Sequence, residues 1–228
     1  MAYTVFNSQN LHIPTGVLFD MDGLVLDSEK LYSRFWQEAC ISLGYPMTHD
    51  QALTMRALNA EAGEANLKKF FGPDIDYASV HGARIRLMDA FVEEHGIAPK
   101  PGIRELLAFL KERGIGAALA TSSPMDRIQS YLAPLDLLNK FDAVCSCREV
   151  SHGKPEPDIF LYAAGKLHCS PRDCLVLEDS PAGILSGFRA GCIPVMIPDQ
   201  DQPGEDTRKL LTAQADSLFD IIDLISEL

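Results

Sequence analysis

Short, uninterrupted apolar runs that each end in a polar residue are the feature that most limits how this chain can fold. They are Gly16–Phe19, Gly116–Ala120, Cys174–Leu177 and Ile193–Ile197, with a further candidate at Phe141–Cys145. Runs without polar alternation are typical of strands that are covered on both faces, as in a parallel sheet. Because helical patterns separate these runs, the sequence predicts a doubly wound α/β core with a parallel sheet.

The stretch between the first and second predicted strands breaks this rhythm. From about Leu31 to Gly96 only helical patterns are found, with no convincing buried strand. The simplest domain map therefore has an α/β catalytic core formed by residues 1–30 and 97–228. A helical cap domain, residues 31–96, is inserted after the first strand. The length of 228 residues fits such a core with one insertion and excludes several large domains.

Net charge and composition limit the kinds of partner and the cellular location that we expect for this protein. The formal charge of -12 argues against nucleic acid, because a long polyanion would be repelled. We expect the six cysteines to be reduced thiols, because the chain is large enough to fold without disulfides and contains no CxxC pair. The spacing of Cys145, Cys147 and His152 fits no common zinc pattern. Residues 1–14 lack the pattern of a signal peptide, and no apolar run approaches the ~18 residues of a membrane span. The sequence thus predicts a cytoplasmic protein without a membrane partner, and it is compatible with a monomer or a weak dimer.

The polar residues that end the predicted strands are the candidate reactive groups, because function in an open parallel sheet gathers beyond the carboxyl ends of its strands. They are Asp20, Asp22, Thr121, Ser122, Lys154, Glu178 and Asp179. Carboxylates are hard oxygen ligands that suit Mg²⁺, and a bound cation would relieve the repulsion among clustered acids. The hydroxyls and the lysine suit a phosphate group. We therefore expect a magnesium and phosphate site at this edge of the sheet.

This set of groups predicts phosphoryl transfer, a reaction that needs mainly positioning and charge neutralisation. An attacking aspartate would form an aspartyl-phosphate and divide the reaction into two easier steps. A second aspartate, two residues further on, could protonate the leaving alkoxide and then deprotonate water. Any one of these residues alone would more often be a turn or helix-cap residue, so the joint pattern carries the prediction.

Four segments resemble, in order and spacing, the motifs of the haloacid dehalogenase superfamily. They are Asp20–Ser28, Thr121–Ser123, Lys154–Asp158 and Leu177–Gly183. The resemblance covers about Thr15 to Pro198 and extends to the subgroup of β-phosphoglucomutase and small sugar-phosphate phosphatases. It implies a Rossmann-like core and a helical cap that closes over the substrate.

The same resemblance implies the residue roles. Asp20 would be the nucleophile, and Asp22 would be the general acid/base that also gives a backbone carbonyl to Mg²⁺. Glu178 and Asp179 would be the carboxylates on the metal side. The phosphate-binding residues would be Thr121, Ser122, Lys154 and Gly23. Dehalogenation is disfavoured, because dehalogenases of this superfamily normally lack the second aspartate.

The leading hypothesis is a Mg²⁺-dependent phosphomonoester hydrolase that acts on a small phosphorylated sugar, polyol or nucleoside-like metabolite. The alternative is a β-phosphoglucomutase-type phosphomutase. It is disfavoured because the Gly-x-Ser-Arg-like signature of that enzyme is missing from Met55–Glu61, and Tyr32 stands where the mutase has a histidine. A signalling receiver is disfavoured by the order of the motifs, and a catalytically silent relative by the intact Asp20 and Asp22. The cationic side chains of the cap are expected to be solvated: Arg56, Lys68, Lys69, Arg84 and Arg86.

Overall fold

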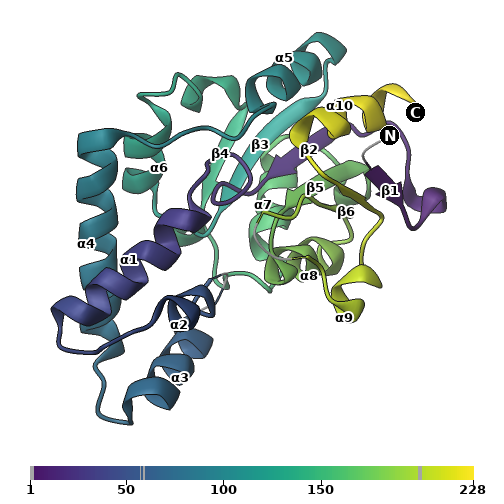
Figure 1. Cartoon of the computed structure of the whole chain (residues 1–228). Coiled ribbons are helices and arrows are strands. Elements are labelled where there is room, and N and C mark those ends of the chain that lie inside the picture. Colours follow the sequence, from purple (N-terminus) through teal and green to yellow (C-terminus); the bar gives the residue numbers. More distant parts are fainter. Residues whose placement is uncertain (1–2, 57, 59, 200–201) are drawn as a thin grey trace. The chain divides into compact units, whose positions relative to one another are not determined.

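The computed structural model describes residues 3–56, 58, 60–199 and 202–228 (Figure 1). The chain divides into two compact units. One consists of Met1–Asp27 with Ala98–Leu228, and the other of Ser28–Ile97. Two residues of the cap stretch discussed above, 57 and 59, lie outside the described residues.

The first unit is built on one seven-stranded sheet with the order β1-β7-β6-β5-β2-β3-β4. Its strands are β1 Tyr3–Val5, β2 Gly16–Phe19, β3 Gly116–Thr121, β4 Ala143–Ser146, β5 Cys174–Glu178, β6 Ile193–Met196 and β7 Ala213–Ala215. All neighbouring pairs are parallel except the edge pair β1 and β7, which is antiparallel. The prediction of a doubly wound parallel sheet is confirmed, although β1 and β7 were not predicted from the sequence.

Strand β2 explains why the apolar runs do not alternate. Gly16 pairs with Gly116 of β3 on one side and with Cys174 of β5 on the other, and Val17, Leu18 and Phe19 are fully buried. A central parallel strand is covered by helices on both faces, so every position along it favours an apolar residue.

Helices cover the faces of this sheet (Figure 1). They are α5 Ile103–Arg113, α6 Met125–Leu132, α7 Asp158–Lys166, α8 Pro181–Arg189, α9 Glu205–Arg208 and α10 Leu218–Ser226, with 3-10 turns at Ser8–Asn10, Leu138–Lys140, Cys147–Glu149 and Pro171–Asp173. Phe160 and Ala163 of α7 pack in one cluster with Leu18 of β2 and Val176 of β5. This packing holds β2 and β5 in place, and the polar residues of the predicted site lie at the carboxyl ends of these strands.

The second unit contains helices α1 Glu29–Ser42, α2 His49–Leu53, α3 Ala60–Phe71 and α4 Tyr77–His95. Trp36 and Cys40 of α1 form a core with Leu67 of α3 and Val80 of α4. Within the described part of the chain, none of the helices is both long and apolar enough to cross a lipid bilayer.

One residue of this unit departs from expectation. Arg84 was expected to be solvated, but it is only 5% exposed. Its guanidinium carbon lies 4.8 Å from the ring centroid of Tyr32 and 5.4 Å from that of Trp36, and its Nη2 lies 2.9 Å from Nε2 of His81. The negative faces of the two rings stabilise the buried cation, so the prediction for Arg84 was wrong.

Candidate active site

The turn after β2 carries the first two acidic residues. Asp20 continues the sheet, because its N–H donates to the carbonyl of Leu177 at 3.1 Å. The chain then folds back on itself: the N–H groups of Val25 and Leu26 both donate to the carbonyl of Met21 at 2.9 Å. Gly23 in this turn has a φ of 80°, in the left-handed region that favours glycine. The turn therefore explains Gly23 without a phosphate, and its role in phosphate binding stays a prediction.

Lys154 joins the first acidic residue to the end of β5. Its Nζ donates to Oδ1 of Asp20 at 2.5 Å, to Oε1 of Glu178 at 2.6 Å and to the carbonyl oxygen of Ala120 at 3.1 Å. The side chains of Lys154, Asp20 and Glu178 are 8%, 12% and 1% exposed. An ammonium group has three N–H donors, so all of them are used in this arrangement.

Burial and nearby charges shift the pKa values of Asp20 and Lys154. Burial raises the pKa of the Asp20 carboxyl to about 7. Lys154 opposes this rise, while the carboxylates of Glu178 and Asp22 add to it. For Lys154, burial lowers the pKa, but the attraction of Asp20 and Glu178 outweighs it and leaves the pKa above its ordinary value. Lys154 is therefore a cation at neutral pH, and the Asp20 carboxylate depends on a nearby positive charge.

The start of α8 holds Glu178 in place. The N–H and the hydroxyl of Ser180 donate to Oε2 of Glu178 at 3.1 and 2.8 Å. The Ser180 hydroxyl also accepts from the N–H of Gly183 at 3.1 Å, which caps the helix. A Cβ at Gly183 would lie 1.7 Å from Oε1 of Glu178. Glycine is thus the residue that leaves room for the Glu178 carboxylate, and neither Ser180 nor Gly183 was assigned a role from the sequence.

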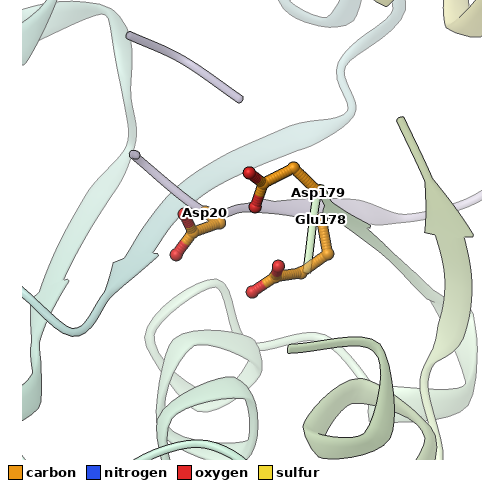
Figure 2. Close-up of side chains that lie close together, drawn as sticks. All are labelled: Asp20, Glu178 and Asp179. Carbon is orange, nitrogen blue, oxygen red and sulfur yellow. The ribbon is translucent and has the colours of Figure 1, made fainter. Parts of the chain in front are cut away.

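Three carboxylates at the ends of β2 and β5 gather around one region (Figure 2). Asp20, Glu178 and Asp179 each offer a ligand oxygen, and these oxygens lie within 4.8 Å of one another. A set of carboxylate oxygens is the donor chemistry that Mg²⁺ prefers, since this ion combines a few carboxylates with water and phosphate oxygens. The residues present therefore fit a magnesium ion.

The end of β3 contributes hydroxyl groups. Thr121 is buried, and its Oγ1 accepts from the N–H of Ser123 at 3.0 Å. The hydroxyl of Ser123 donates to Oδ2 of Asp22 at 3.2 Å, and its carbonyl accepts from the hydroxyl of Ser146 at 2.9 Å. These bonds bring β3 and β4 together with the turn after β2.

Ser122, which was predicted to bind phosphate together with Thr121, lies in a different environment. Ser122 is exposed, and the described part of the chain shows no bond between it and the acidic residues. Its role in phosphate binding stays a prediction. Ser123 was missed, although alternate residues of an extended segment point to the same side, so its position two residues after Thr121 was the available signal.

The fold and the site define an α/β enzyme with its reactive groups at the carboxyl edge of a parallel sheet. The chain belongs to the haloacid dehalogenase-like hydrolases, because the model of that family matches residues 14–191. The resemblance seen in the four motifs is thereby confirmed.

Known proteins support this assignment. Phosphorylated carbohydrates phosphatase of Thermotoga maritima is 32% identical over 188 residues, covering 77% of this chain and 81% of that protein. Beta-phosphoglucomutase of Bacillus subtilis is 30% identical over 193 residues, covering 82% and 84%. A solved structure, the HAD hydrolase of family IA, variant 3, from Entamoeba histolytica, is similar with a TM-score of 0.79 at 24% identity, covering 92% of this chain and 99% of that one. This last likeness concerns the fold alone.

Proposed function

We propose that the protein is a Mg²⁺-dependent phosphomonoester hydrolase that acts on a small phosphorylated sugar, polyol or nucleoside-like metabolite through an aspartyl-phosphate. The observation that carries this proposal is the buried cluster in which Lys154 bridges Asp20 and Glu178 at 2.5 and 2.6 Å. The similarity to a phosphatase of phosphorylated carbohydrates supports the substrate class. The six free cysteines support a reducing, cytoplasmic location.

In this mechanism a carboxylate oxygen of Asp20 attacks phosphorus, and the bond from phosphorus to the ester oxygen breaks. Asp22 gives its proton to the leaving alkoxide. Asp22 then takes a proton from water as that water attacks the aspartyl-phosphate, which releases inorganic phosphate and restores both carboxyl groups. The covalent step divides one difficult displacement into two easier ones.

Asp20, Glu178, Asp179 and the backbone carbonyl of Asp22 would hold the Mg²⁺, which supplies positive charge that lowers the repulsion between the phosphate and the attacking carboxylate. Lys154 would bind the transferring phosphoryl group. Because its three donors are taken by Asp20, Glu178 and the carbonyl of Ala120, it must exchange one of these acceptors for a phosphoryl oxygen. The Thr121 hydroxyl would be a further donor to that group.

The second candidate is a phosphomutase, which the similarity to beta-phosphoglucomutase favours. The same aspartyl-phosphate serves both reactions, and they differ in whether water or a sugar hydroxyl accepts the phosphoryl group. A coupled assay with glucose 1-phosphate and a bisphosphate primer distinguishes them. Conversion of glucose 1-phosphate that outpaces phosphate release would replace the phosphatase proposal by the mutase.

The experiment that tests the proposal is a phosphate-release screen of the purified protein with Mg²⁺ over many monoesters, ranked by kcat/KM. We expect turnover of at least one sugar or polyol phosphate by the wild type and none by Asp20→Asn. A matched control is Asp206→Asn, since the Asp206 side chain is 98% exposed and its variant should retain wild-type rates. Absence of phosphate release across the panel would refute the proposal, and turnover by Asp20→Asn would reassign the nucleophile.

A further inference from the structure

An ion pair outside the acidic cluster ties two distant segments of the first unit together. Nζ of Lys100 lies 2.5 Å from Oδ1 of Asp199, and the two side chains are 20% and 7% exposed. The other carboxylate oxygen of Asp199, Oδ2, is buried without a hydrogen-bond partner among the described residues. Burial of a carboxylate oxygen without a hydrogen-bond partner costs free energy.

The backbone of Lys100 holds the segment that follows the turn after β2. Its N–H donates to the carbonyl of Val25 at 2.9 Å, and the N–H of Asp27 donates to the carbonyl of Ala98 at 2.9 Å. Leu26 and Pro99 form the antiparallel bridge between these bonds. Residues 25–27 and 98–100 therefore form a short two-stranded ribbon, and Lys100 is the residue of this ribbon that carries the ion pair.

This ribbon fixes the turn that carries Asp22. The N–H of Gly23 donates to the carbonyl of Leu26 at 3.0 Å, and Asp22 itself forms a bridge with Leu26. Leu26 is therefore hydrogen-bonded to both chain neighbours of Asp22, Met21 and Gly23. A displacement of Leu26 must be transmitted to Asp22 through these bonds. The next residue along this path is Val25, whose carbonyl Lys100 holds.

The other end of the ion pair is anchored at the metal side of the site. Two residues before Asp199, the N–H of Ile197 donates to the carbonyl of Glu178 at 2.8 Å. The ion pair thus joins the turn with Asp22 to the edge of the sheet that carries Glu178 and Asp179. The ion pair is thus one link between the segment of the proton donor and the strand end of the acids that would hold the metal.

We propose that Lys100 and Asp199 are positioning residues that hold Asp22 at the ester oxygen of the substrate. This inference rests on the proposed function, and it adds a requirement of its own. Lys100 and Asp199 act on the reaction through the backbone of residues 21–27. Loss of the ion pair should therefore impair proton transfer to the leaving group more than the attack by Asp20.

Leaving-group dependence separates this role from a merely structural one. An alkyl phosphate needs a proton on its departing alkoxide, whereas p-nitrophenyl phosphate releases a stable phenolate that needs little help. The experiment compares kcat/KM for these two substrates in the wild type, Lys100→Met and Asp199→Asn. In both variants we expect the rate with the alkyl phosphate to fall about tenfold or more, because a small misplacement of a catalytic group is costly. The rate with p-nitrophenyl phosphate should fall much less.

Three variants make the test specific. Lys100→Arg keeps the charge and should keep the wild-type ratio of the two rates. Lys140→Met removes another ion pair of the same unit, 3.4 Å from Asp136 and exposed on both sides, and should leave both rates unchanged. Asp22→Asn provides the reference for complete loss of the proton donor and should show the largest change in ratio.

The outcomes separate the two proposals. A wild type that releases no phosphate from any monoester of the screen would refute the proposed function itself. An active wild type with the same ratio of rates in Lys100→Met and in Asp199→Asn would overturn the positioning role and leave the proposed function intact. If Lys100→Met is recovered unfolded, as judged by circular dichroism, the isosteric Asp199→Asn decides the question.

Discussion

Replacement of Gly183 by alanine tests the geometry of the acidic cluster most directly, because two physical effects predict opposite results. Gly183 lies within α8, where alanine is favoured over glycine by about 1 kcal/mol. Helix propensity alone therefore predicts a more stable protein. The position of the Glu178 carboxylate predicts the reverse.

The structure gives the size of the conflict. A Cβ at position 183 would lie 1.7 Å from Oε1 of Glu178 and 1.8 Å from its Cδ, whereas real Cβ contacts are not found below 3.0 Å. The carboxylate must therefore move by at least 3.0 − 1.7 = 1.3 Å. The Glu178 side chain is 1% exposed. Such a shift breaks its 2.6 Å bond with Lys154 and its bonds with Ser180. Disrupting a buried ion pair costs about 3–5 kcal/mol, so we expect a net loss of about 2–4 kcal/mol.

Urea denaturation followed by far-UV circular dichroism measures this loss. The matched control is Gly165→Ala in α7, where an added Cβ meets nothing within 4 Å, so the variant should be neutral or up to about 1 kcal/mol more stable. We also expect Gly183→Ala to lose phosphate turnover, since Lys154 would lose one of its anchors. If Gly183→Ala were as stable as Gly165→Ala and fully active, the placement of Glu178 against α8 would be refuted.

Three further predictions concern the same cluster. Mg²⁺ at a hundredfold excess over its Kd should raise the free energy of unfolding by about 2.7 kcal/mol, and Asp179→Asn should lose most of that gain in a thermal-shift titration; an undiminished gain would exclude Asp179 as a ligand. Because the pKa of Asp20 is raised to about 7 in the folded protein from 3.8, the folded state holds this proton more tightly than the unfolded state. Without metal, the stability that the Asp20 carboxyl contributes should therefore be lost as the pH rises from about 4 through 7. In EDTA, the stability of the wild type relative to Asp20→Asn should fall over this range, and a constant difference would contradict the shift. Lys154→Met leaves Asp20 and Glu178 buried without their cation and should cost about 3–5 kcal/mol in urea denaturation, whereas a cost under about 1 kcal/mol would show that the carboxylates are neutral.

Four of the strands that the sequence predicts, β2, β3, β5 and β6, are buried along almost their whole length. β2, β3 and β5 read as continuous apolar runs because helices pack on each side of them, and this signal is strong even in four or five residues. The strands that were not predicted, β1 at the edge of the sheet and its neighbour β7, have three residues each. Ala213–Ala215 contains a glutamine at its centre, so nothing in its composition separates it from a loop.

The candidate site shows a similar division. Asp20, Glu178 and Asp179 could be grouped from the sequence because parallel strands bring their carboxyl ends to one edge. The proximity of Gly183 to Glu178 and the pairing of Lys100 with Asp199 depend on side-chain positions that no spacing encodes. The prediction that Arg84 is solvated was wrong for the same reason. The rings that bury its side chain belong to α1, whereas Arg84 lies on α4.

The central place of β2 in the sheet also governs how the chain can acquire its structure during synthesis. Residues 16–19 find their hydrogen-bonding neighbours only at residues 116–119 and 174–177, and pairings over such long separations in sequence form slowly. On a ribosome, β2 must therefore wait for its first neighbour until about residue 119 has emerged, and for its second until about residue 177 has emerged. A fragment that ends before β5 lacks the partner on one side of β2, so the carboxylate at its tip cannot reach its final surroundings however well the earlier helices have formed.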